Sequence, residues 1–251
     1  MTTVQNFTIQ GRTVRLPVLI RDARSWAATF VVDAGAAQSL LEPTGLEIAE
    51  MRPGKAIASV AAVRYEDGDL DRYNEVAVAL LVRPHDAPPA SAARKGIEVA
   101  RNQTGVYIHH LPVDQGFTLE AGRTIWGYPK FMAEISIDEE PRVATVSLRH
   151  EGMHVLTLTV RRGLKPWPRV PNLPTYTYLD GVLRRTPWET FPEGTRGRPG
   201  GASLELGTHP IADELRSLGL PKRALLSTSV ARVRARFGAS EIVTPARGAI
   251  R

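Results

Sequence analysis

The chain has 251 residues, of which 43% are hydrophobic and 23% charged, and this composition excludes a disordered or fibrous protein. The absence of cysteine excludes disulfides, thiolate nucleophiles and cysteine-bound zinc or iron–sulfur clusters. The net charge is +6, but basic and acidic residues are interleaved and aromatic residues make up only 6%, so we expect no nucleic-acid partner.

The sequence contains no stretch typical of membrane insertion. Its first segment, MTTVQNFTIQGRTVRLP, lacks the basic and apolar regions of a secretory signal peptide. The longest aliphatic run, residues 76–82, is far shorter than the ~18 residues that a spanning helix needs. We therefore expect a cytoplasmic protein with no membrane partner.

The first predicted element is a short helix over residues 34–41, capped by Asp33. A second predicted helix lies within residues 209–221, where Gly219 and Pro221 end it. Between them, residues 165–199 are dense in Pro, Trp, Tyr and Gly, and we predict a loop from Glu193 onward. Alternation of apolar and polar residues predicts strands at 76–82, 105–111, 133–137, 143–148, 154–160 and 229–237.

These elements predict a β-dominated α+β fold. The residues after 199 offer no separate core, so we predict a single domain over residues 1–251. We expect a large antiparallel, strongly curved or barrel-like sheet with a few short helices.

Residues 150–154, His-Glu-Gly-Met-His, match the H-E-x-x-H zinc motif, which requires a helix to place both imidazoles on one face. The flanking sequences alternate with period two and a glycine lies at the centre, so we predict a hairpin turn and no metal site. His109 and His110 fall within a predicted strand, and we expect one on each face of the sheet.

The most unusual local sequence is AGRTIWGYPKFMAEI, residues 121–135, in which Lys130 is surrounded by aromatic and aliphatic residues. Only five of the 32 basic residues are lysines. Desolvation favours the neutral form of a lysine amine, which attacks ketones to form a Schiff base. From the residues alone, the alternative is that Lys130 lays its stem on the aromatic residues with its ammonium group in water.

This segment resembles the active-site region of the acetoacetate decarboxylase family, in which a Gly-Arg turn leads through an aromatic residue and proline to the Schiff-base lysine. The matching residues are Gly122, Arg123, Tyr128, Pro129 and Lys130. The sequence Arg-Tyr-Asn-Glu at residues 72–75 also resembles the family, with its active-site glutamate falling on Glu75, and the likeness extends over roughly residues 16–240.

The resemblance implies a cofactor-independent lyase that decarboxylates a β-keto acid of the acetoacetate type through an imine on Lys130. Glu75 would move protons during imine formation, or would otherwise be a strand-end acid paired with Arg72. Trp126, Tyr128 and Phe131 would shape the substrate pocket. The family also implies a small keto acid as partner and a homo-oligomer.

Three positions depart from the family. Phe131 stands where the best-known decarboxylases have a second lysine. The second pocket carboxylate would fall near Val60, and the pocket arginine near Ala23, where Arg24 or Arg21 would have to replace it. We name Arg24 as the candidate that binds a substrate carboxylate.

Two alternatives to decarboxylation remain open. An iminium on Lys130 also activates a larger keto acid for aldol addition, retro-aldol cleavage or dehydration. The chain could instead bind a small molecule without turnover.

Overall fold

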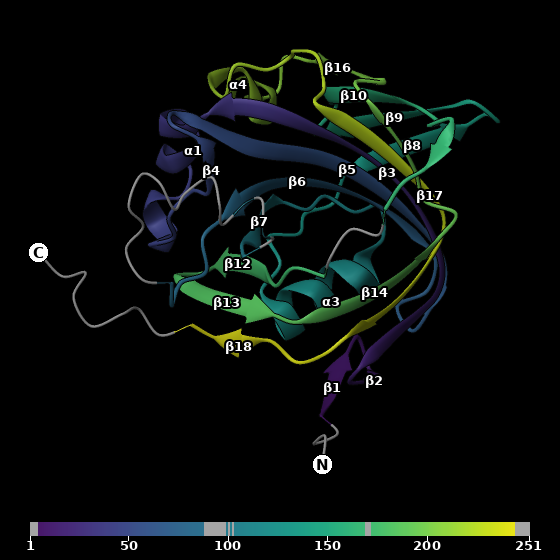
Figure 1. The fold of residues 1–251 in the computed structure, drawn as a ribbon. Helices are drawn as coiled ribbons and strands as arrows, with labels where there is room; N and C mark the ends of the chain where they lie inside the picture. Colours follow the sequence, from purple (N-terminus) through teal and green to yellow (C-terminus); the bar gives the residue numbers. More distant parts are fainter. Residues whose placement is uncertain (1–4, 88–98, 100, 102, 169–171, 244–251) are drawn as a thin grey trace, which may run out of the picture.

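The structure is a computed structural model that describes residues 5–87, 99, 101, 103–168 and 172–243 (Figure 1). Its helices are α1 (Ala34–Ser39), α3 (Gly116–Trp126) and α4 (Pro210–Ser217), with a 3-10 turn η1 (Glu42–Thr44). None of the helices in this part of the chain is long and apolar enough to span a bilayer.

Most of the described chain is β-structure, arranged in three sheets. The largest contains β3 (Val18–Asp33), β4 (Glu50–Arg52), β5 (Lys55–Gly68), β6 (Tyr73–Val82), β7 (Gly105–His110), β11 (Lys165–Pro166), β12 (Thr175–Leu179), β13 (Val182–Thr186), β14 (Trp188–Glu193), β15 (Arg196–Pro199), β17 (Leu226–Phe237) and β18 (Glu241–Ile242). A second sheet contains β8 (Glu134–Glu139), β9 (Val143–His150), β10 (Met153–Arg161) and β16 (Ala202–Leu206). The third is the hairpin of β1 (Asn6–Ile9) and β2 (Arg12–Arg15).

The strand order of the large sheet is β11-β15-β17-β3-β5-β6-β7-β12-β13-β18, with β14 paired to β17 and β4 to β5. All its pairings are antiparallel except β7–β12, which is parallel, so the prediction of a wholly antiparallel sheet is wrong at that pairing. The long connection from β7 through α3 and the second sheet permits this parallel pairing. Among the described strands, β11 and β18 lie at the two ends of the sheet and do not pair with each other, and the expected strongly curved or barrel-like sheet is not confirmed.

The six predicted strands and two predicted helices are confirmed within a few residues. Asp33 Oδ1 accepts a hydrogen bond of 3.0 Å from the Ala36 amide, which caps α1 as expected. The predicted loop from Glu193 is wrong: β14 ends there and β15 follows at once, because glycines in left-handed conformations make tight turns between short strands. The 150–154 motif forms the β9–β10 hairpin, as predicted.

Alternate residues of the long strands face opposite sides of the large sheet. On β3, Trp26, Ala28 and Phe30 pack with residues of β9 and β10 in one core, which joins the two sheets. Ala23, on the same strand, belongs instead to a second core with the residues that α3 buries. Figure 1 shows α3 on the side of the large sheet away from β8, β9 and β10. The side that carries α3 also carries the candidate site.

Candidate active site

Helix α3 and the turn after it place Lys130. The Gln115 side chain accepts a hydrogen bond of 2.6 Å from the Thr118 amide at the start of the helix. Gly127 ends the helix in a left-handed conformation with φ of 63°, which suits glycine because it has no Cβ. The chain then turns back, and Arg123 Nη1 donates a hydrogen bond of 3.1 Å to the Lys130 carbonyl.

Gly122 gives the Lys130 side chain room to lie along the helix. A Cβ at position 122 would lie 2.6 Å from Lys130 Cδ and 2.7 Å from Cε, closer than real side chains approach. The Gly-Arg pair therefore acts structurally on the lysine, with the glycine accommodating its stem and the arginine holding its backbone.

The Lys130 amine is buried and makes three contacts. Its side chain is 4% exposed, and Nζ lies 2.9 Å from Glu75 Oε2. Nζ also donates a hydrogen bond of 3.0 Å to Thr118 Oγ1. The ring of Tyr73 lies beneath it, with its centroid 5.0 Å from Nζ. The alternative in which the ammonium reaches water is therefore wrong.

Strand pairing brings Glu75 to the lysine. Glu75 on β6 lies opposite Val63 on β5, and two residues away Tyr73 lies opposite Tyr65. Tyr65 donates a hydrogen bond of 3.1 Å to Glu75 Oε1, and its ring stacks on Tyr73 with centroids 4.2 Å apart. The carboxylate of Glu75 thus connects Tyr65 to Lys130. The alternative in which Glu75 pairs with Arg72 is wrong, because Arg72 forms an ion pair with Glu66.

Three tyrosines around the carboxylate stay protonated. Burial raises the pKa of Tyr65, Tyr73 and Tyr128, and the negative charge of Glu75 raises each further. The hydroxyl groups therefore keep their protons near neutral pH and can donate hydrogen bonds.

A cavity of about 120 Å³ adjoins the amine. Trp126 and Tyr128, which we expect in the substrate pocket, line it together with Trp188 and Phe237. Lys130 and Glu75 are the only charged side chains among its described lining residues. The site therefore combines one buried ion pair with largely apolar walls.

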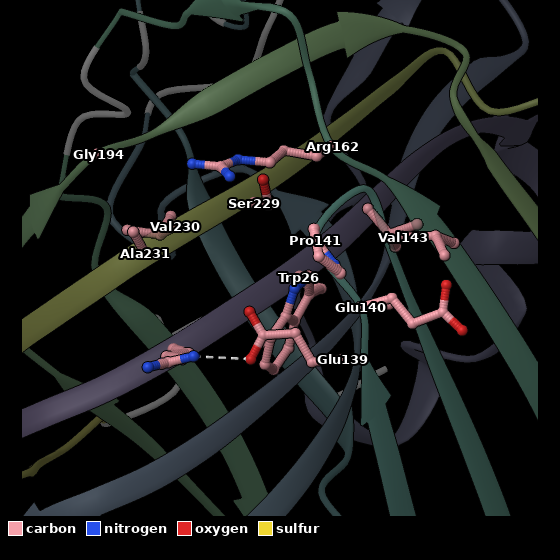
Figure 2. Close-up of a pocket in the computed structure, with 13 residues that line it drawn as sticks. Trp26, Glu139, Glu140, Pro141, Val143, Arg162, Gly194, Ser229, Val230 and Ala231 are labelled. Atoms are coloured by element: carbon pink, nitrogen blue, oxygen red, sulfur yellow. Dashed lines mark hydrogen bonds and ion pairs between the residues drawn. The ribbon is translucent and has the colours of Figure 1, made fainter.

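Arg24 and Phe131 lie away from this cavity. Arg24 donates a hydrogen bond of 2.9 Å to Glu139 Oε2, in a hollow of about 240 Å³ that Glu139, Glu140 and Arg162 also line (Figure 2). Alternation along β3 explains why Arg24 points away from the cavity. The adjacent residue Ala23 belongs to the core that contains α3, so Arg24 faces the other side of the sheet. Phe131 follows Lys130 and packs on His150, with ring centroids 4.6 Å apart, against the core that joins the two sheets.

Arg21 and Val60, the other positions that depart from the family pattern, also lie away from the cavity. Arg21 forms ion pairs with Asp67 at 2.7 Å and Asp69 at 2.6 Å and does not line the cavity. Val60 belongs to the core between the two sheets, whereas Ala61 lines the cavity. No arginine and no second acid therefore replace the family's missing groups among the described lining residues.

Sequence reasoning missed Tyr65, Thr118, Trp188 and Phe237. Tyr65 and Thr118 contact the ion pair, and the other two close the cavity from β14 and β17. The spacing of Val63 and Tyr65 in the sequence indicates that both lie on one face of a strand. It does not indicate which residues of β6 lie opposite them, because these partners depend on the strand register.

Outside the cavity at Lys130, two clusters of histidine and glutamate among the described residues bring possible metal ligands close together. One is His109, His110 and Glu214, and the other is His150, Glu151 and His209; within each, the ligand atoms lie within 4.8 Å of one another. The expectation that His109 and His110 face opposite sides is wrong, because a register shift between β6 and β7 turns both towards Glu214.

The family model described as acetoacetate decarboxylase matches residues 8–245. No curated protein sequence matches the chain. Among solved structures, an acetoacetate decarboxylase from Legionella pneumophila has a TM-score of 0.71 at 19% identity, covering 91% of this chain and 87% of its own.

Two other structures extend the comparison. A second acetoacetate decarboxylase has a TM-score of 0.72 at 18% identity and covers 92% of this chain and 90% of its own. The enduracididine biosynthesis enzyme MppR, in complex with pyruvate, has a TM-score of 0.67 at 14% identity and covers 92% of each chain. At such identities these structures show a shared fold, and the family match shows that this chain belongs to the acetoacetate decarboxylase family.

Proposed function

We propose that this chain is a Schiff-base lyase that decarboxylates a β-keto acid through an imine on Lys130. The observation that carries the proposal is the buried amine of Lys130, 2.9 Å from Glu75 at the edge of a cavity with apolar walls. An amine that reacts with a ketone must first lose a proton, and Glu75 is in position to accept it.

The first stage forms the imine. Glu75 takes a proton from the Lys130 ammonium group, the free amine attacks the keto carbon, and Glu75 passes this first proton to the carbonyl oxygen, which becomes a hydroxyl group. Glu75 carries a proton from the nitrogen to this hydroxyl group, which leaves as water. Tyr65, bonded to the other oxygen of Glu75, holds the carboxylate in orientation during both transfers.

The second stage releases carbon dioxide. Electrons of the bond between the α-carbon and the carboxylate move to the iminium nitrogen, and an enamine forms. Protonation of the enamine carbon and hydrolysis of the imine then release the ketone and restore the amine. Apolar walls favour the step that disperses the carboxylate charge, because few groups solvate the substrate carboxylate before it leaves.

A second candidate function keeps the imine but uses it for aldol chemistry or dehydration of a larger keto acid. Two observations favour it. No arginine lines the cavity among the described residues, and a solved structure of the relative MppR contains the condensation product of pyruvate and imidazole 4-carboxaldehyde.

Borohydride trapping tests both functions against a merely binding role. The purified chain is incubated with acetoacetate, pyruvate or acetone, reduced, digested and examined by mass spectrometry. We expect a covalent adduct on Lys130, none in Lys130→Ala, and an undiminished adduct in Lys55→Ala, because Lys55 is a surface lysine beside Asp33.

Carbon dioxide release from acetoacetate and longer β-keto acids then separates the two functions. Release that depends on Lys130 supports the lyase. Trapping on Lys130 without release from any β-keto acid would support the aldol or dehydration alternative. An adduct that persists in Lys130→Ala contradicts both.

A further inference from the structure

A second, larger cavity adjoins the cavity at Lys130. Its volume is about 340 Å³, and we call it the side chamber. Its floor consists of Ala23, Ser25 and Ala27 on β3 and Ala61 and Val63 on β5. These residues occupy the side of the large sheet that also carries α3 and Lys130.

The two cavities have a common wall. Five residues line both: Ala61, Val63, Tyr65, Trp188 and Phe237. Tyr65 is also the residue that holds Glu75. A molecule attached to Lys130 would therefore lie beside residues that also line the side chamber.

The side chamber is apolar and exists because its floor residues are small. Ala27 on β3 lies directly opposite Ala61 on β5, and Ser25 lies opposite Val63. None of the described residues that line the chamber carries a charge. Such a surface binds hydrocarbon and offers no oppositely charged partner to a carboxylate or a phosphate.

Size supports the same conclusion. Ligand sites typically enclose roughly 300–1,000 Å³. The cavity at Lys130, at about 120 Å³, is below this range, whereas the side chamber, at about 340 Å³, lies within it. A four-carbon keto acid would leave the side chamber without a ligand group.

We propose that the side chamber binds the apolar chain of the substrate, so that the preferred substrate is a β-keto acid with an alkyl chain or aromatic ring on its keto carbon. This inference rests on the proposed imine at Lys130. The keto carbon reaches the Lys130 amine, while the chain extends past Val63 and Phe237 onto the alanines of β3.

A chain-length series tests the proposal without any substitution. Carbon dioxide release is measured with acetoacetate, 3-oxohexanoate and 3-oxooctanoate, and imine trapping with acetone, 2-pentanone and 2-heptanone. Burial of a methylene group favours binding about fourfold, so we expect kcat/KM and trapping to rise about fifteenfold for every two methylenes.

A filling variant locates the effect. Ala27→Leu places a larger side chain on the floor of the side chamber, and we expect it to lower the ratio of 2-heptanone to acetone trapping by about tenfold. The matched control is Ala231→Leu, on the exposed outer face of β17, where Ala231 lines the hollow of Figure 2. It should leave the ratio at the wild-type value, and thermal melts establish that both variants fold.

The outcomes separate the two proposals. A wild-type chain that traps acetone and 2-heptanone equally overturns the side-chamber proposal and leaves the imine function standing. A chain that traps neither ketone overturns the imine function itself. An unchanged ratio in Ala27→Leu assigns any chain-length effect to another surface and also contradicts the side-chamber proposal.

Discussion

Glu75 contacts a different partner with each of its carboxylate oxygens. Lys130 lies 2.9 Å from one and Tyr65 lies 3.1 Å from the other. An unusual setting made Lys130 recognisable in the sequence, because a lone lysine among aromatic residues is uncommon. Tyr65 could not be identified in this way, since its contact with Glu75 arises only when β5 pairs with β6 in the observed register.

Glu75→Gln should slow imine formation by about 10²-fold, because an amide keeps the shape of the carboxylate but cannot accept the proton of the amine. The measurement is the rate of borohydride trapping on Lys130 with a fixed ketone. Glu66→Gln is the matched control, since Glu66 pairs with Arg72 on the surface. Equal trapping rates in Glu75→Gln and the wild type would exclude Glu75 from proton transfer.

At the scale of elements, α3 positions the lysine through a residue with no side chain. In Gly122→Ala, the new Cβ would lie 2.6 Å from Lys130 Cδ and displace the amine from Glu75. A displacement of about 1 Å costs roughly 10²-fold in rate, so we expect trapping to fall by about that factor while the helix is retained. Gly116→Ala is the control on the same helix, because a Cβ there meets nothing within 4 Å. Wild-type trapping in Gly122→Ala would contradict this role.

The bulged strand β7 and the helix α4 form a pH-sensitive contact. His109 and His110 each lie 2.8 Å from Glu214 Oε2, and these hydrogen bonds lower the pKa of Glu214. Burial lowers the pKa of His110. A lowered pKa means that the unfolded chain binds the proton more readily, so both groups lose their stabilising effect as the pH falls.

Stability should therefore decline on acidification, first below the ordinary histidine pKa of 6.5 and again below the ordinary glutamate pKa of 4.5. Glu214→Gln should lower the free energy of unfolding by about 1 kcal/mol at pH 7, because the carboxylate is partly exposed and screened. The difference from wild type should shrink towards pH 3. Urea unfolding at several pH values measures it, with Glu205→Gln on β16 as control. A constant difference from pH 7 to pH 3 would contradict the assignment.

At the scale of the whole molecule, elements with a strong local sequence pattern could be predicted, whereas long-range strand pairings could not. Strands β9 and β10 of the second sheet were predictable because apolar residues alternate along them over eight or nine residues. The short strands β12 to β15 were not, since they lie in a segment rich in Pro and Gly, which is typical of loops, and their stability comes from neighbours far along the chain. The parallel pairing of β7 with β12 has no local signal at all.

Two predictions about the whole molecule stay predictions. One is that residues 1–251 form a single domain. The other is the homo-oligomer that the family implies, which light scattering on the purified chain tests. A monomer mass of 27.5 kDa would contradict it.

The burial of Lys130 against Glu75 also has a consequence for folding. An ion pair removed from water gains little net stability, whereas loss of one partner leaves a buried charge and costs about 3–5 kcal/mol. Single substitutions at Lys130 or Glu75 should therefore lower the free energy of unfolding in addition to any effect on activity. A variant in which neutral residues replace both should melt at a higher temperature than either single variant. The loss of either residue alone should thus destabilise the chain more than the loss of both.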